Sequence, residues 1–303
     1  GITLALARGA RMGGATILEN VRATGFRMGR AGRIAAVRWE AGGEAGEPAC
    51  EAVVNCAGMW AREVGAWAGA VVPLQACEHF YAVTEPIQGL TQLPVLRVPD
   101  ECTYYKEDAG KLMVGAFEPK AKPWAVDGLP ADFEFTELPP DFDHCEPILA
   151  GAVNRIPLLQ TAGFRTFFNG PESFTPDNAY HLGPTPECAN LWVAAGFNSV
   201  GIQSAGGAGM ALAHWMDAGE RPFDLSDVEV ARAEPFQRNR RYLAERVSET
   251  LGLLYADHFP FRQKATARGV RRSPFHAHLA ARGAVFGEVA GWERANWFAE
   301  AGQ

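Results

Sequence analysis

The stretch from Leu191 to Met216 constrains the fold more than any other part of the chain. It opens with the apolar run Leu191–Ala195, which has the length of one buried strand. A turn follows at residues 196–199, and then a helix rich in small residues, which lets backbone or a ligand come close. A strand that leads through glycine into a helix directs unpaired N–H groups and the positive end of the helix dipole at one point. Such a point suits an anionic or electron-rich ligand atom. The alternative is that the glycines only let the helix pack on a sheet.

Composition limits the class of protein. The chain has 303 residues, of which 48% are hydrophobic, so it can bury the core of one large or two modest domains. Its net charge of −7 gives no general attraction to nucleic acid or to an acidic membrane. No apolar run approaches the length of a membrane span, and no secretory signal opens the sequence. The six scattered cysteines include no C-x-x-C pair and indicate reduced, mostly buried thiols in the cytoplasm, or alternatively in the mitochondrial matrix.

The first part of the chain has the pattern of the second half of a doubly wound nucleotide-binding domain. A helix ends at Gly13-Gly14, and two alternating strands follow, separated by the tight-turn sequence Gly29-Arg30-Ala31-Gly32. The apolar run Ala52–Gly58 predicts a buried parallel strand that ends in a glycine turn before a helix. The sequence has no G-x-G-x-x-G turn of the kind that normally opens such a domain. We therefore expect the chain to be an internal part of a longer protein.

The middle of the chain has a different character. From about Val72 to Phe168, short extended runs alternate with turns and proline, which predicts an antiparallel sheet. An acidic, proline-containing loop leads into a helix at about Phe142–Val153. After Arg221-Pro222 we expect a helical region and then an irregular tail. The predicted fold class is α/β (α+β overall), with a partial doubly wound domain, an antiparallel-sheet domain and a helical C-terminal connector.

Five segments, in this order and at these separations, resemble the dimethylglycine dehydrogenase and sarcosine dehydrogenase family of FAD enzymes. They are VVNCAGMWAREVG (53–65), VPLQACEHFYAVTEPI (72–87), LPVLRVPDECTYYKEDAGKLMVGAFE (93–118), FFNGPESFTPD (167–177) and LWVAAGFNSVGIQSAGGAGMALAHWM (191–216). The tail, LYADHFPFRQKATARGVRRSPFH (254–276) and GAVFGEVAGWERANWFA (283–299), resembles the connector that leads into that family's folate-binding domain, which is similar to the glycine-cleavage T-protein. The resemblance covers essentially the whole chain.

The resemblance implies an FAD enzyme that oxidises a small N-methyl amino acid, dimethylglycine or sarcosine, by passing a hydride to the flavin. Tetrahydrofolate bound in the absent C-terminal domain captures the resulting iminium, or water hydrolyses it to formaldehyde. A soluble electron-transferring flavoprotein is the implied electron acceptor. The expected domains are an incomplete FAD-binding domain (1–72 and 168–222), a substrate domain (73–167) and the connector (223–303).

Two active-site residues follow from the resemblance, His79 and Tyr104. An imidazole with the ordinary pKa of about 6.5 can help to keep the amine unprotonated, the form that gives up hydride. Tyr104 is expected to hydrogen-bond His79 or to position the substrate. Because neighbours on a strand face opposite ways, only one of Tyr104 and Tyr105 should face the site. From the residues alone, the alternatives are a hydrogen-bonded histidine on a strand and an aromatic side chain in a half-buried sheet.

The resemblance also implies the residues that hold the cofactor. Ala57, Gly58 and Trp60 match the turn beside the cofactor, and Ala23 matches the position whose backbone meets the adenine. The loop beside the pyrimidine end of the isoalloxazine is matched by Phe197, Asn198, Ser199, Val200 and Gly201. Backbone N–H groups in that loop would stabilise negative charge on the reduced flavin. For Asn198 and Ser199, ordinary helix N-capping is an interpretation compatible with the first.

Other candidate sites find no support. His276 and His278 alternate in an Arg-rich tail without cysteine or carboxylate partners, so no metal site is predicted. The basic clusters Arg238–Arg241 and Arg268–Arg272 predict solvated faces or interdomain contacts, and no nucleic-acid or membrane partner. Ser173 lies in GPESF rather than in G-x-S-x-G, so hydrolase chemistry gains no support.

One departure from the family limits the prediction. The family's flavin is often attached to a histidine near the N-terminus, in a region that this sequence does not contain. We therefore expect the chain alone to hold FAD poorly, to expose a sheet edge and to be inactive, so that the function belongs to the parent protein. The alternatives are another amine or 2-hydroxy-acid flavoenzyme of the same fold, and a non-catalytic scaffold for a folate-dependent aminomethyltransferase domain.

Overall fold

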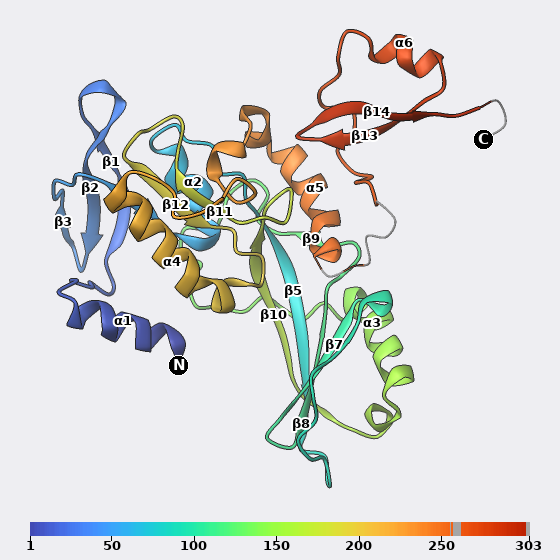
Figure 1. Ribbon diagram of the computed structural model, residues 1–303. Helices are drawn as coiled ribbons and strands as arrows, with labels where there is room; N and C mark the ends of the chain where they lie inside the picture. Colours follow the sequence, from blue (N-terminus) through green and yellow to red (C-terminus); the bar gives the residue numbers. More distant parts are fainter. Residues whose placement is uncertain (255, 257–261, 301–303) are drawn as a thin grey trace. The chain divides into compact units, whose positions relative to one another are not determined.

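The computed structural model describes residues 1–254, 256 and 262–300 and forms two compact units (Figure 1). The first unit contains Gly1–Pro73 and Ala179–Pro235, and the second contains Leu74–Asn178 and Phe236–Gln303. These boundaries differ from the predicted ones at residues 168 and 223. The reason at 168 is that a strand continues to Phe174 as part of the second unit's sheet. Residues 255 and 257–261 of the tail motif lie outside the described residues.

The first unit consists of two small sheets, three α-helices and short 3₁₀ turns. Its elements are α1 (Ile2–Met12), β1 (Arg22–Met28), β2 (Ile34–Ala41), β3 (Glu44–Gly46), β4 (Val53–Asn55), α2 (Ala61–Ala66), β11 (His181–Pro184), β12 (Leu191–Ala195) and α4 (Gly201–Ala218). Strands β1, β2 and β3 form one antiparallel sheet, with a 3₁₀ turn at Arg30–Gly32 where the tight turn was predicted. In the other sheet β12 pairs parallel with β4 and antiparallel with β11. The parallel strand predicted within Ala52–Gly58 is thereby confirmed, but of its residues only Asn55 is buried and Val54 is exposed.

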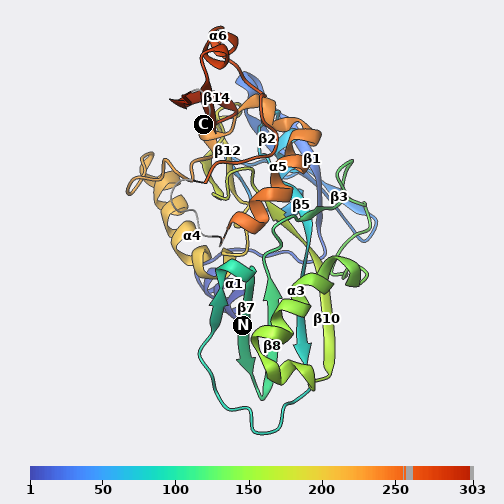
Figure 2. The same ribbon diagram turned by 90° about the vertical axis from the view of Figure 1, so that its right-hand side faces the viewer.

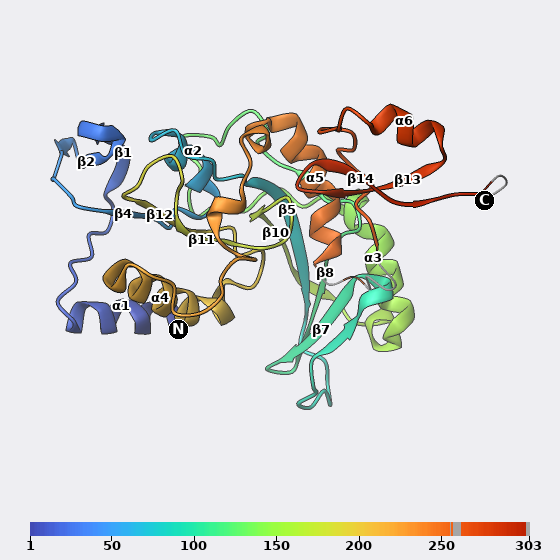
Figure 3. The same ribbon diagram turned by 45° about the horizontal axis from the view of Figure 1, so that its top comes forward.

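Helix α4 covers one face of the β11–β12 pair (Figure 3). Its buried Leu212 and Trp215 pack with Leu182 of β11, which accounts for the apolar stripe among its small residues. The buried Asn190 joins the two sheets, because its side chain bonds both the N–H and the C=O of Ile34 on β2. Each polar atom that this asparagine buries is thus paired, as a core requires.

The second unit is built on a long antiparallel sheet with the strand order β10-β5-β8-β7-β6. Its elements are β5 (Gln75–Thr84), β6 (Leu96–Val98), β7 (Thr103–Asp108), β8 (Lys111–Ala116), β9 (Lys122–Pro123), α3 (Phe142–Arg155), β10 (Phe164–Phe174), α5 (Arg240–Leu253), α6 (His276–Ala281), β13 (Ala284–Val289) and β14 (Trp292–Phe298). The predicted antiparallel sheet and the predicted helix at 142–153 are both confirmed. The helical C-terminal connector was only partly right, because β13 and β14 pair as a hairpin.

A helix packs on each face of this sheet. Helix α3 lies along the sheet in the view of Figure 2, and its Cys145 packs with Phe80 of β5 and Ala116 of β8. Helix α5 packs its Val247 and Leu251 with Cys77 of β5 and with Phe174 of β10. Since side chains alternate along a strand, neighbouring residues of β5 point toward different helices.

A buried ion pair ties α5 to the C-terminal hairpin. The guanidinium of Arg246 lies 2.6 Å from Glu288 of β13, and both side chains are almost fully buried. The same guanidinium donates to the carbonyl of Thr266, and Arg268 of the predicted basic cluster pairs with Glu293 of β14. The cluster at 268–272 is therefore partly an internal contact of this unit.

Two features bear on the environment of the protein. All six cysteines are free thiols, as predicted, and Cys77, Cys145 and Cys188 are buried. Among the helices of the described ranges, none combines the length and the apolar character needed to cross a membrane.

Candidate active site

The turns after β4 and β12 leave the same edge of the first unit's sheet. The two strands are parallel, and Asn55, the last residue of β4, is paired with Val193 of β12. Ligands of open α/β sheets bind outside the carboxyl ends of parallel strands. The structure therefore brings together two of the predicted cofactor segments, 57–60 and 197–201. Ala23 lies apart from them, exposed on β1 of the other sheet and opposite Trp39.

The turn after β4 is held by Asn55, a residue that was not predicted from the sequence to belong to the site. The side chain of Asn55 is buried; its Oδ1 accepts the Ala57 N–H at 3.2 Å, and its Nδ2 donates to the Ala61 carbonyl at 2.8 Å. Gly58 has a φ of 57°, in the left-handed region that favours glycine. A Cβ added there would meet no atom within 4 Å, so the space beside the turn is open. The asparagine that ends the apolar run was the available signal in the sequence.

The turn after β12 has an unusual backbone. Gly196, Asn198 and Ser199 all have positive φ, at 73°, 44° and 67°. Non-glycine residues in such conformations each cost on the order of 1–3 kcal/mol, and they persist where the surroundings fix them. Here the side chain of Asn198 is buried, and the Phe197 ring stacks on Tyr180 with centroids 4.5 Å apart.

Helix α4 begins directly after this turn. Its N-cap residue is Val200, whose side chain makes no capping bond, so the N-capping interpretation of Asn198 and Ser199 was wrong. The left-handed backbone of those two residues is incompatible with the extended conformation usual at an N-cap. The first N–H groups of any α-helix lack intrahelical acceptors, and here they lie beyond a glycine turn at the carboxyl end of a strand. Together with the open space at Gly58, these donors fit an anionic or electron-rich group such as part of FAD.

In the second unit, His79 lies near the middle of β5 and forms a pair with a buried carboxylate. Its Nδ1 is 3.1 Å from Oε2 of Glu118, which follows β8. The side chains of His79 and Glu118 are 13% and 2% exposed, respectively. The imidazole is flanked by the rings of Phe117 and Phe174, at centroid distances of 5.1 and 6.4 Å. The predicted histidine is therefore enclosed by aromatic side chains and bonded to a carboxylate.

The surroundings of His79 raise its pKa and so favour the charged imidazolium. Burial alone lowers the pKa of the imidazole, but the hydrogen bond to Glu118 and the negative charges of Glu118 and Glu172 outweigh it. The net effect raises the pKa of His79 above its ordinary value. The pKa of His79 in the structure is therefore higher than the ordinary value of about 6.5 that was assumed from the sequence.

Tyr104 lies on the same side of the sheet as His79. It is opposite Gly115 in the β7–β8 pair, and its ring contacts that of Phe117 at a centroid distance of 5.8 Å. Phe117 thus contacts both predicted active-site residues. Tyr105 is buried in a different cluster, with Val114 and residues of α3, so the two tyrosines face opposite ways as predicted.

Glu118 was not recognised as a site residue from the sequence, although it ends one of the quoted segments. Its position depends on α5, since Gly252 of that helix lies directly against the backbone of Glu118 and Pro119. A Cβ at Gly252 would be 2.6 Å from the carbonyl oxygen of Glu118. A lone carboxylate directly after the apolar end of a strand was the only sequence signal.

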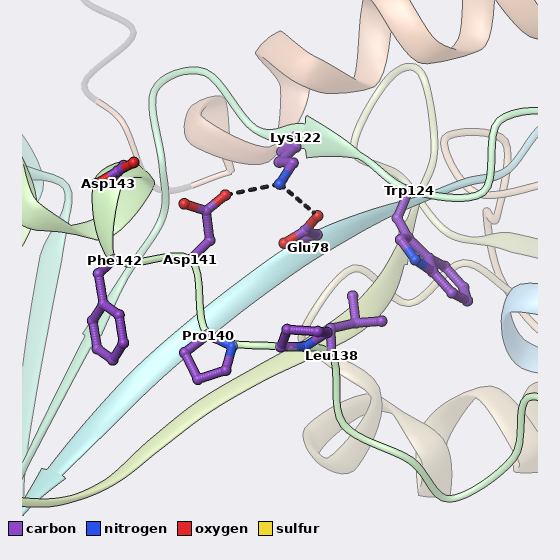
Figure 4. A pocket seen from close by; sticks show the side chains of 9 residues that line it. Glu78, Lys122, Trp124, Leu138, Pro140, Asp141, Phe142 and Asp143 are labelled. Carbon is purple, nitrogen blue, oxygen red and sulfur yellow. Dashed lines mark hydrogen bonds and ion pairs between the residues drawn. The ribbon is translucent and has the colours of Figure 1, made fainter.

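The opposite face of β5 carries an open pocket of about 450 Å³ (Figure 4). Lys122 lies in it between two carboxylates, 3.0 Å from Glu78 and 2.8 Å from Asp141. These bonds to Asp141 and Glu78 raise the pKa of Lys122. The positive charge of Lys122 is thus balanced by these two carboxylates. Glu78, although next to His79 in sequence, belongs to this separate cluster of charges.

No metal centre is found in the part of the chain that the structure describes, where no three His, Cys, Asp or Glu side chains are arranged to hold an ion. His276 instead stacks on Phe286, with ring centroids 4.3 Å apart.

Comparison with known proteins identifies the family. A family model described as FAD dependent oxidoreductase matches residues 1–215, and one for the FAD dependent oxidoreductase central domain matches residues 218–273. The chain is 48% identical to 4-methylaminobutanoate oxidase (formaldehyde-forming) of Paenarthrobacter nicotinovorans, over 84% of this chain and 31% of that protein. It is 37% identical to mitochondrial sarcosine dehydrogenase of Mus musculus, over 98% of this chain and 32% of that protein. The chain therefore spans about one third of the length of these relatives.

A solved structure supports the fold. L-proline dehydrogenase from P. horikoshii superposes with a TM-score of 0.64 at 22% sequence identity, over 76% of this chain and 58% of that chain. With a family model matched over residues 1–215 of its 303 residues, the chain belongs to the FAD dependent oxidoreductases.

Proposed function

We propose that the protein uses FAD to oxidise the N-methyl group of a small N-methylated amino acid. The observation that carries the proposal is the His79–Glu118 pair, an imidazole in an aromatic surrounding with a carboxylate at its Nδ1. Such a pair can take the proton from a substrate ammonium, and an amine must lose that proton before it can be oxidised. The two relatives' names, 4-methylaminobutanoate oxidase and sarcosine dehydrogenase, share the same chemistry, an N-methylated amine that also bears a carboxylate.

Each part of the chain has a proposed task. The turn at Ala57–Trp60 and the loop at Phe197–Gly201 hold the cofactor, and Ala23 contributes backbone to the adenine end. When bound, FAD supplies the acceptor for the hydride. The N–H groups at the start of α4 favour negative charge on whatever they bind. In the second unit, His79 accepts the substrate's proton, while Tyr104 and the neighbouring aromatic rings hold the N-methyl group and exclude water.

The wider setting is proposed from the family resemblance. Tetrahydrofolate would take up the one-carbon product in a domain outside this chain, and a soluble electron-transferring flavoprotein would take the electrons. The free thiols are compatible with a reducing compartment, and we propose the cytoplasm. Of the substrates, sarcosine, dimethylglycine and 4-methylaminobutanoate are the candidates to compare.

The test is an anaerobic absorption spectrum, with FAD bound, of the parent protein to which the proposed function belongs. Addition of sarcosine, dimethylglycine or 4-methylaminobutanoate should bleach the flavin band. The matched controls are glycine and 4-aminobutanoate, which lack the N-methyl group and should leave the spectrum unchanged. Bleaching by a 2-hydroxy acid in place of an N-methyl amine would contradict the proposal, and so would bound flavin that no N-methyl amine reduces.

A further inference from the structure

The carboxylate of Glu118 is buried at a cost that the rest of the fold does not compensate. A buried charge is unfavourable unless it is paired and hydrogen-bonded. Within the described residues, Oε1 of Glu118 has no hydrogen-bond partner, and Oε2 bonds the imidazole of His79. An ion pair with Arg or Lys would stabilise the carboxylate better than this arrangement does. The pairing with a titratable ring therefore points to a role in proton transfer.

We propose that Glu118 is the positioning residue of a Glu118–His79 dyad, which holds the imidazole with its proton on Nδ1 and its Nε2 free to accept a proton from the substrate. The proposal rests on the proposed function for the identity of the substrate. It adds a second residue to that site, one that acts through His79.

The tautomer follows from the chemistry of the two partners. An ionised carboxylate can only accept a hydrogen bond, so the Nδ1 atom that faces Oε2 must carry a proton. A neutral imidazole has only one N–H, and its Nε2 is then a bare acceptor. This tautomer is the minor one for a histidine side chain in water, which makes it a specific sign of the dyad.

The proton transfer balances without a further reactant. The N–H bond of the substrate ammonium breaks and an N–H bond forms at Nε2, so the positive charge moves from the amine to the imidazole. No electrons change hands in this step. The carboxylate of Glu118 stabilises the imidazolium that forms, as the buried aspartate does in a Ser-His-Asp triad.

The charged groups that face His79 come from two elements. Glu118 bonds it from the segment after β8, and Glu172 of β10 adds a more distant negative charge. On β5 itself, Cys77 stays a neutral thiol, since burial and the nearby carboxylates raise its pKa strongly. Helix α5 contributes the apolar Val247 and Leu251 to this side of the sheet. Glu118 is thus the acidic group in direct contact with the ring.

The experiment is a pH titration of the histidine ring ¹⁵N and ¹³C resonances by NMR, with His79 assigned from a His79→Asn sample. In Glu118→Gln the titration midpoint of His79 should fall by about one pH unit or more, because the opposite charge is gone. The matched control is Glu78→Gln, which removes a carboxylate from the neighbouring residue on the opposite face of β5. The control should leave the midpoint of His79 unchanged. An unchanged midpoint in Glu118→Gln, or an equal fall in Glu78→Gln, would overturn the dyad.

A second measurement needs no variant. In the unmodified chain above the midpoint, the ¹⁵N shifts of His79 should show a protonated Nδ1 and an unprotonated Nε2. A proton on Nε2 would overturn the proposal even if Glu118→Gln failed to fold.

The flavin-loaded parent protein provides the functional readout. The rate of flavin reduction by an N-methyl amine should rise with pH, and its midpoint should move to lower pH in Glu118→Gln but not in Glu78→Gln. A shifted NMR midpoint without any flavin reduction would refute the proposed function and leave the dyad intact. Flavin reduction whose pH profile ignores Glu118 would refute the dyad and leave the function intact.

Discussion

The Nδ1 atom of His79 lies 3.1 Å from Oε2 of Glu118, a carboxylate that is almost fully buried. The two residues are 39 positions apart and come from β5 and from the segment after β8. The two residues are too far apart in sequence for local structure to explain their contact. The β5–β8 pairing brings the two segments together, and the approach of α5 at Gly252 fixes the backbone that carries the carboxylate.

This pair makes the stability of the second unit depend on pH. Folding raises the pKa of His79, so the folded state binds the proton more tightly than the unfolded chain. The stabilisation is complete below the unfolded pKa of about 6.5 and is lost as the pH rises through the folded value. We expect the free energy of unfolding to fall more between about pH 6 and about pH 9 in the unmodified chain than in Glu118→Gln. Urea titrations at both pH values measure this free energy of unfolding. Equal losses of free energy in the unmodified chain and in Glu118→Gln would contradict the pairing of His79 with Glu118.

Gly252 should tolerate no side chain. An added Cβ would meet the carbonyl oxygen of Glu118 and the Cα of Pro119, each at 2.6 Å. We expect Gly252→Ala to lower the free energy of unfolding by about 1–3 kcal/mol, since the contact is with backbone that cannot rotate away. The control is Gly151→Ala in α3, where a Cβ meets nothing within 4 Å. That change should be neutral or stabilising by up to about 1 kcal/mol. Equal changes in unfolding free energy for the two substitutions would show that Gly252 of α5 is not in close contact with the backbone of Glu118.

The turn beside β4 should depend on Asn55. Removing its side chain leaves the half-buried N–H of Ala57 and the buried carbonyl of Ala61 without their partner. We expect Asn55→Ala to cost about 1–3 kcal/mol in unfolding free energy and to weaken FAD binding, because the turn is no longer held. Asn55→Asp keeps the acceptor for Ala57 but loses the donor, and should have an intermediate effect on the turn. Chemical denaturation and a fluorescence titration with FAD measure the two quantities. Unchanged FAD affinity in Asn55→Ala would separate this turn from the cofactor.

The prediction from sequence succeeded where the structure is locally determined. The run Leu191–Ala195 forms β12 because its side chains are apolar, and the glycine after it ends the strand. Helix α3 begins where Asp141 accepts the N–H of His144, which is a local capping signal. The tight turn at residues 29–32 and the opposite faces of Tyr104 and Tyr105 likewise follow from neighbours in the chain.

The prediction failed where distant segments decide the outcome. Glu118 became a site residue only because β5 and α5 enclose it, and its partner lies far away in sequence. The backbone of Asn198 and Ser199 is left-handed in its folded surroundings, a conformation that their residue types do not require. The strands β13 and β14, AVFGEV and WERANWF, show no regular apolar–polar alternation, so the sequence was interpreted only as a connector. His79 itself was named by the resemblance, since its residue type alone favours no role.

The buried pair of Arg246 and Glu288 should be costly to break. Both side chains are at most 5% exposed, and Arg246→Leu leaves the carboxylate of Glu288 without its partner. We expect a loss of about 3–5 kcal/mol in unfolding free energy. The control is Arg155→Leu, which breaks the exposed pair with Glu101 and should cost no more than about 1 kcal/mol. Urea denaturation compares them, and similar losses would mean that the hairpin is not anchored through α5.

The central claim is that the protein oxidises an N-methyl group, and the most direct measurement is anaerobic flavin reduction with N-CH₃ and N-CD₃ forms of one substrate. The account predicts that the N-CH₃ amine bleaches the flavin and that deuteration of the methyl group slows the bleaching, because a methyl C–H bond breaks. Deuteration of the methylene carbon on the other side of the nitrogen should have little effect. A slowing caused by the methylene deuterium alone, or bound flavin that no N-methyl amine bleaches, would contradict the account.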